Sequence, residues 1–170
     1  MCTIYYMIVK DSMILIHLAK ITLLEKSCEY FKKVIISKKV FEEVTLCKEK
    51  NYPDIEIIEN LIQKRKINII EIKNKNYLNK VYEFNIQKGE AESVVLYWQE
   101  NAEYLATDDD NVRKKNFILN LKIIGTPSII LKLYKEGIIQ KEKFIDSLSK
   151  LKKIGWFNNT IIDKLLMEVK

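Results

Sequence analysis

The sequence predicts an α/β protein with three α/β/α layers, in which helices cover both faces of a central, mainly parallel five-stranded sheet. Short β-prone apolar runs alternate with longer segments of helical periodicity, which is the pattern of a parallel sheet with crossover helices. The 170 residues, 48% of them hydrophobic, suffice for one domain with a buried core. Residues 138–170 show no strand pattern, so we expect a C-terminal helical extension packed on the domain of residues 1–137.

The first half of the chain alternates apolar runs with helix start signals. The run that ends at Val9 is uncharged and β-prone, and Asp11-Ser12 then marks a helix start. Ser37 is suited to cap the next helix, and Pro53 to open the one after it. The expected elements are strand Thr3–Val9, helix Ser12–Lys20, strand Val34–Ile36, helices Lys38–Lys50 and Asp54–Lys66, strand Ile67–Ile72 and helix Lys75–Asn85.

The second half continues this alternation. Gly89 precedes a helix whose Val94 and Trp98 are expected to face the core. Asp108–Asp110 form a turn after the fourth strand, and Gly125-Thr126-Pro127 begins the helix after the fifth. The expected elements are helix Glu90–Asn101, strand Tyr104–Thr107, helix Asn111–Phe117, strand Leu121–Ile124, and helices Ser128–Glu136, Lys141–Lys152 and Asn159–Glu168.

Several classes of protein are excluded by composition. The longest uncharged run, Met1–Val9, is far shorter than the ~20 apolar residues of a membrane span. It also lacks the pattern of a signal peptide, so we expect a cytoplasmic protein without a membrane partner. The three cysteines show no CxxC spacing, which argues against a disulfide framework or zinc ribbon. No dinucleotide or P-loop motif is present.

The net charge of +6 is compatible with a nucleic-acid partner but does not identify one. Nearly all basic residues are lysines, and Arg65 and Arg113 are the only arginines. Because arginine is the usual residue for bidentate reading of bases and phosphates, the charge alone is weak evidence.

Acidic residues follow the first and the fourth predicted strands. Asp11 follows the first, and Asp108-Asp109-Asp110 follow the fourth. The carboxyl ends of parallel strands lie at one edge of the sheet, where ligands of such folds bind, so we expect these acids to approach one another. For a single aspartate, helix capping is the more common role. Three consecutive aspartates exceed what one cap requires.

Two glutamates extend this acidic set. Glu43 lies on the apolar face of helix Lys38–Lys50, where an unpaired carboxylate is costly. A buried ion pair or an edge position explains Glu43 as well as a metal role does. Glu90 is in register with Val94 on the side turned toward the protein, whereas Glu92 is expected to be a solvated surface acid. Helix capping remains the alternative for both Glu90 and Glu92.

The candidate site therefore consists of carboxylates: Asp11, Glu43, Glu90, Asp108 and Asp109. Hard oxygen ligands without histidine or cysteine suit Mg²⁺ or Mn²⁺, which activate water and neutralise charge on a phosphate. His17 is the only histidine, so His-rich metal sites are excluded, and we expect His17 on a helix surface or in the core.

Five blocks of the chain carry a pattern of higher specificity. They are the strand ending in Asp11-Ser12, VFEEV at 40–44, GEAE at 89–92, TDDDNVR at 107–113 and LKIIGTPSIILKLYKEGII at 121–139. In this combination the sequence resembles the PIN-domain ribonucleases, including the VapC-like toxins of toxin–antitoxin pairs. The last three blocks look like a prokaryotic branch whose third acid is Glu instead of the usual Asp.

The resemblance implies roles for individual residues. The four catalytic acids fall on Asp11, Glu43, Glu90 and Asp109, and the metal ligands on Asp11, Glu90 and Asp109, with Asp108 as the adjacent alternative to Asp109. Ser12 and Thr107 match polar positions near the metal. Arg113 is a candidate for binding phosphate, although an i,i+4 ion pair with Asp109 is slightly favoured for it.

The implied activity is Mg²⁺- or Mn²⁺-dependent endonucleolytic cleavage of RNA, leaving a 5′-phosphate without a covalent intermediate. The implied partners are RNA, an antitoxin protein and a second copy in a homodimer, with residues 1–137 as the nuclease domain. The alternative is a catalytically weak PIN scaffold that binds RNA or protein. A DNA flap nuclease would use the same chemistry.

Overall fold

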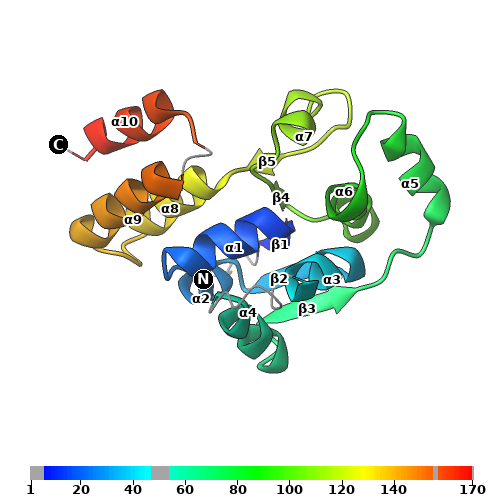
Figure 1. The fold of residues 1–170 in the computed structure, drawn as a ribbon, viewed down its shortest axis with the longest axis horizontal. Helices are drawn as coiled ribbons and strands as arrows, with labels where there is room; N and C mark the ends of the chain where they lie inside the picture. The colour runs from blue at the N-terminus through cyan, green and yellow to red at the C-terminus, as the bar shows by residue number, and fades with distance from the viewer. Residues whose placement is uncertain (1–5, 47–53, 155–156, 170) are drawn as a thin grey trace, which may run out of the picture.

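The central sheet is parallel throughout. In the computed structural model, which describes residues 6–46, 54–154 and 157–169, five strands lie in the order β3-β2-β1-β4-β5 (Figure 1). Every pair of neighbouring strands is parallel. The strands are β1 (Met7–Lys10), β2 (Lys33–Ser37), β3 (Ile67–Ile70), β4 (Tyr104–Ala106) and β5 (Ile123–Ile124). The predicted α/β/α class with a five-stranded sheet is thereby confirmed.

Helices cover both faces of the sheet because strand side chains alternate between two cores. Ile8 of β1 lies in one hydrophobic cluster and its neighbour Val9 in the other. The first cluster takes apolar residues of α1 (Ser12–Lys20), α2 (Leu24–Phe31), α3 (Lys38–Leu46), α4 (Asp54–Gln63), α8 (Thr126–Lys135), α9 (Lys141–Ile154) and α10 (Asn159–Met167). The second takes those of α5 (Lys75–Tyr82), α6 (Lys88–Glu100) and α7 (Asp110–Lys114).

The chain reverses its direction of travel across the sheet at β1. It proceeds from β1 through β2 to β3 at one edge, and then returns to add β4 and β5 on the opposite side of β1. Lys10 at the end of β1 is consequently paired with Ala106 at the end of β4. The backbone N–H of Asp11 donates to the Ala106 carbonyl over 3.1 Å. This is the topological switch point at which open α/β sheets bind ligands.

One helix was not anticipated, and several boundaries differ from those predicted. α2 buries Leu24, Cys28 and Phe31 at helical spacing, but Leu23 at its N-cap makes no side-chain capping hydrogen bond. The sequence therefore contains no start signal for α2. α1 begins and ends where predicted, whereas α7 ends at Lys114 instead of reaching Phe117. Parts of the predicted strand Thr3–Val9 and helix Lys38–Lys50 fall outside the described residues.

The last two helices extend the first cluster beyond α8, because α9 packs against α8 and α10 packs against α9. Phe144, Leu148 and Leu151 of α9 and Ile162 of α10 are buried in the first cluster. The division into residues 1–137 and 138–170 stays a prediction. Among the described residues, no helix has both the length and the apolar character needed to cross a membrane.

Lys10 is a fully buried lysine at the end of β1. Its Nζ donates to Ser27 Oγ over 2.7 Å and lies 5.8 Å from the centre of the Phe31 ring. Burial lowers the pKa of Lys10, while the nearby Cys28 acts in the opposite direction. Ser27 therefore supplies the only oxygen acceptor of the amine among the described residues, and Cys28 Sγ is a weaker acceptor at 3.9 Å.

We predict that removing one member of the Lys10–Ser27 pair is worse than removing both. Ser27→Ala leaves the amine with only the weak sulfur acceptor of Cys28 and should cost ~1–3 kcal/mol in the free energy of unfolding. Lys10→Met combined with Ser27→Ala should equal or exceed the wild-type stability in urea titrations. The pKa of Lys10 is lower in the folded protein than the 10.5 of the unfolded chain. The free energy of unfolding of the wild type should therefore increase, relative to that of the double variant, as the pH rises toward 10.5. A Ser27→Ala protein as stable as wild type would contradict this account.

Candidate active site

Four acids from four different elements lie around the carboxyl ends of β1 and β4. Asp11 is the N-cap of α1, and Asp109 is the N-cap of α7. Glu43 lies on α3, and Glu90 lies in the first turn of α6. Residues that are almost a hundred positions apart in sequence are thus brought to one edge of the sheet.

Asp11 is the most deeply buried of these acids, with 2% of its surface exposed. Its Oδ1 accepts the N–H of Ile14 over 2.8 Å, whereas its buried Oδ2 has no hydrogen-bond partner in the described part of the chain. The pKa of Asp11 is raised to about 8, chiefly by burial and in smaller part by the charges of Asp108 and Glu90. The Thr107 hydroxyl and the Ile14 amide oppose this shift of the pKa. Helix capping therefore occupies one oxygen and leaves the other available.

Glu43 is held by hydrogen bonds, with no ion pair to another described residue. Its Oε1 accepts the N–H of Gly89 over 2.9 Å, and its Oε2 accepts the hydroxyl of Ser12 over 3.1 Å. A Cβ at position 89 would lie only 2.4 Å from Glu43 Oε2, so any larger residue there would force the Glu43 carboxylate to move. The carboxylate on the apolar face of α3 therefore joins α3 to the first turns of α1 and α6.

Glu90 and Asp109 share a cleft. Burial raises the pKa of Glu90, and the charges of Glu43 and Asp109 add to this effect, while its own backbone N–H and Lys88 oppose it. Asp109 Oδ1 accepts the N–H of Val112 over 2.8 Å. The cleft has a volume of about 300 Å³ and is lined by Asn85, Ile86, Gln87, Lys88, Glu90, Asp109 and Asn111. The carboxylate of Asp109 is close enough to disfavour the ionisation of Glu90.

Asp108 has both carboxylate oxygens engaged by the protein. Oδ1 accepts the N–H of Thr126 over 2.8 Å, and Oδ2 lies 2.8 Å from Nδ1 of His17 and also accepts the Thr126 hydroxyl. His17 is 2% exposed and belongs to the core, one of the two locations expected for it. The adjacent Asp109 instead has its N–H bound to Thr107 Oγ1 over 3.1 Å. The two neighbouring aspartates thus contact different parts of the protein.

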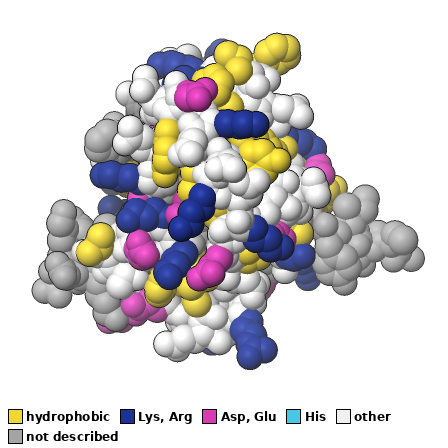
Figure 2. All heavy atoms as spheres, turned by 90° about the vertical axis from the view of Figure 1, so that its right-hand side faces the viewer, with side chains coloured by type: hydrophobic (Ala, Val, Ile, Leu, Met, Phe, Trp, Pro, Cys, Tyr) yellow, Lys and Arg dark blue, Asp and Glu magenta, His cyan; other side chains and the backbone are white. Residues whose placement is uncertain are grey.

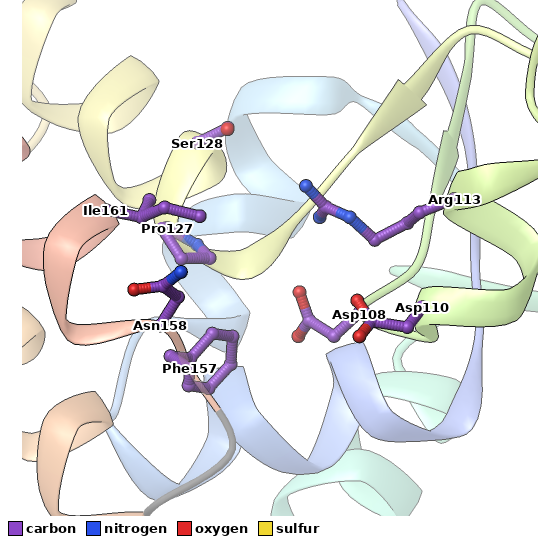
Figure 3. A pocket seen from close by; sticks show the side chains of 8 residues that line it. All are labelled: Asp108, Asp110, Arg113, Pro127, Ser128, Phe157, Asn158 and Ile161. Carbon is purple, nitrogen blue, oxygen red and sulfur yellow. The ribbon is translucent and has the colours of Figure 1, made fainter.

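Arg113 does not form the i,i+4 ion pair with Asp109 that the sequence favoured. Within the described residues, its guanidinium makes no hydrogen bond or ion pair and lies against Gly125, where a Cβ would be 2.6 Å from Nη1. Figure 3 shows Arg113 reaching from α7 into a pocket across from Phe157. Glu92 also differs from expectation, because its Oε2 accepts the Lys39 N–H over 3.0 Å at the start of α3.

The acids do not form a closed ligand set. Within residues 6–46, 54–154 and 157–169, no three acidic, histidine or cysteine side chains converge closely enough to hold an ion as they lie. Around them, the face on the right of Figure 1 carries lysines and arginines interspersed with acids, with no single continuous basic patch (Figure 2). The partners His17, Thr126 and Gly89 were missed by sequence reasoning, because only the folded structure brings them to the acids.

One comparison with known proteins supports a family assignment. A family model described as a PIN domain matches residues 7–170. No curated protein and no solved structure matches the chain.

We predict that Asp11→Asn stabilises the metal-free protein at alkaline pH. An acid whose folded pKa is raised from 3.8 to about 8 loses stability as pH rises through that interval, and asparagine removes this loss while keeping the cap. In urea titrations with EDTA, the advantage of Asp11→Asn over wild type should grow between pH 5 and pH 8.5, reaching a few kcal/mol. Asp11→Ala, which lacks the cap, should lie ~1 kcal/mol below Asp11→Asn at both pH values. A pH-independent difference between Asp11→Asn and wild type would count against the buried carboxylate.

We predict that Gly89→Ala is destabilising although alanine favours helices. The new Cβ would displace the Glu43 carboxylate, at a cost of ~1–3 kcal/mol that exceeds the usual gain from Gly→Ala. Glu43→Ala removes the clashing oxygens, so the double variant should cost less than the sum of the two single variants in a double-mutant cycle. Additive costs would show that Gly89 and Glu43 act independently.

Proposed function

We propose, because this chain belongs to the PIN-domain family, that it is a metal-dependent endoribonuclease of the VapC-like toxin branch. PIN domains are generally nucleases, which supports hydrolysis of a phosphodiester bond. The single observation that carries the proposal is Asp11 Oδ2, a buried carboxylate oxygen with no partner among the described residues, at the switch point of the sheet.

The residues present fit a divalent cation by their chemistry. Asp11, Glu90 and Asp109 offer carboxylate oxygens, and Asp11 and Glu90 have raised pKa values that a cation would lower. We propose these three as the ligands of Mg²⁺ or Mn²⁺. When bound, such an ion lowers the pKa of its water and neutralises charge on the scissile phosphate.

The choice between Asp108 and Asp109 favours Asp109 as the ligand. Both oxygens of Asp108 are taken by His17 and Thr126, whereas Asp109 lines the cleft with Glu90. Asp108 instead anchors the turn after β4 to α1 and α8. We assign it a positioning role.

Other residues of the chain hold the catalytic acids and the substrate in place. Ser12 and the Gly89 N–H fix the carboxylate of Glu43, and the Thr107 hydroxyl fixes the backbone of Asp109. Lys88 lines the cleft and can bind a flanking phosphate. The scarcity of arginine favours contact with the RNA backbone over reading of bases, so we expect loose sequence preference.

The remaining proposals concern partners and location. We propose RNA as substrate, an antitoxin protein and a second copy of the chain as partners, and a cytoplasmic location.

A second candidate function, a catalytically weak scaffold that binds RNA or protein, is favoured by one observation. The described acids do not converge on one point as they lie.

We predict that the protein cleaves single-stranded RNA in the presence of Mn²⁺ and that Asp11→Asn lowers the cleavage rate by roughly 100-fold or more. Glu43→Gln should lower the rate by roughly 10- to 100-fold, because the ligands lose their support. Its neighbour Glu42 is exposed and pairs with Lys39, so Glu42→Gln is the matched control and should cleave like wild type.

Metal binding is measured separately from cleavage. Mn²⁺ should raise the melting temperature of the wild type more than that of Asp11→Asn. Binding of Mn²⁺ or RNA without any cleavage would favour the scaffold. Preference for flap DNA over RNA would point to a flap nuclease.

A further inference from the structure

A second pocket lies beside the cleft of Glu90 and Asp109. It has a volume of about 250 Å³ and lies between α7, the start of α8, and α10 (Figure 3). Its lining residues are Asp108, Asp110, Arg113, Pro127, Ser128, Phe157, Asn158 and Ile161. The volume is slightly below the ~300–1,000 Å³ of pockets for drug-sized ligands, so the pocket suits a single small unit.

The two cavities share one turn of the chain. Asp109 lines the cleft, whereas its neighbours Asp108 and Asp110 line the second pocket. The two cavities share no lining residue, and this turn of the chain is what joins them. The pocket thus lies next to the proposed site of cleavage.

The walls of the pocket differ in chemistry. Figure 3 shows Arg113 on one side, and Phe157, Asn158 and Ile161 on the other. The Arg113 guanidinium has no partner among the described residues, and Gly125 leaves room for it, since a Cβ there would lie 2.6 Å from Nη1. A guanidinium can bind a phosphate, and an aromatic ring can stack on a base. The two sides of the pocket therefore suit the phosphate and the base of one nucleotide.

Two carboxylates, Asp108 and Asp110, also line the pocket. The oxygens of Asp108 already accept hydrogen bonds from Thr126 and lie against His17. Asp110 is exposed at the first turn of α7, where it can accept hydrogen bonds from the amino group of a base. The ring of Phe157 is held by an edge contact with His17, with centroids 5.1 Å apart. This contact supports the aromatic wall from the side of the core.

We propose that this pocket is a nucleotide subsite, which holds one base and one phosphate of single-stranded RNA next to the scissile phosphate. The inference rests on the proposed function and deepens it. Phe157 stacks against the base, Arg113 binds the phosphate, and Gly125 gives the guanidinium its place. Specificity for single strands follows, because a paired base cannot enter a pocket of this size.

The test is RNA binding in EDTA, where metal-dependent cleavage does not interfere. The probe is a short fluorescein-labelled single-stranded RNA, followed by fluorescence anisotropy at several salt concentrations. Phe157→Leu keeps an apolar side chain against His17 but removes the stacking ring, and it should weaken binding about tenfold. Arg113→Met should weaken binding and reduce the slope of log K against log salt by about 0.7. Asp110→Asn keeps an acceptor oxygen for the base but removes a negative charge that repels the phosphate, so it should tighten binding.

Matched controls exist for both substitutions. Arg65, the only other arginine, is exposed on the turn after α4, so Arg65→Met should leave affinity and salt slope unchanged. Phe117 is 93% exposed outside the pocket, and Phe117→Leu should bind like wild type. Melting temperatures of all variants establish that each one is folded.

The outcomes separate the subsite from the proposed function. Wild-type affinity in Phe157→Leu and Arg113→Met, equal losses in the controls, or no RNA binding by the wild type would overturn the subsite, whether or not the protein cleaves RNA. If the variants and controls bind RNA as expected but the protein does not cleave RNA in Mn²⁺, the subsite is supported and the nuclease function fails.

Discussion

The parallel pairing of β1 with β4 is the constraint on which the site depends. This pairing places the N–H of Asp11 on the carbonyl of Ala106, so the residues that follow both strands must lie side by side. The short turn at Thr107–Asp109 then has only a narrow range of positions open to it. Asp11 is buried at this junction and therefore lies close to the charged groups of Asp108 and Glu90.

The protein accommodates clustered carboxylates chiefly through neutral donors. Asp11 and Asp109 accept backbone N–H groups at helix starts, and Glu43 accepts the N–H of Gly89. These donors satisfy carboxylate oxygens without supplying a positive charge. The mutual repulsion that raises the pKa values of Asp11 and Glu90 is therefore not offset by a basic side chain of the cluster, and a bound cation would offset it.

Much of this arrangement could be predicted from the sequence, because strand ends and caps have local signatures. The convergence of Asp11 with the turn at Asp108–Asp109 followed from the parallel topology. The choice between Asp108 and Asp109 could not be made, since it depends on His17 and Thr126, which are distant in sequence. α2 was missed because it lacks a capping side chain, and Glu92 because its acceptor role involves the backbone of another helix.

The turn of three aspartates also bears on how this protein can change over evolutionary time. The successive side chains of this turn point to different surroundings. An insertion or deletion of one residue would therefore put a different side chain at each place. It would disturb the cleft, the core contact of Asp108 and the second pocket at once. Substitutions, by contrast, alter one of these at a time. Length in this turn should therefore be under stronger selection than the identity of any one of its acids.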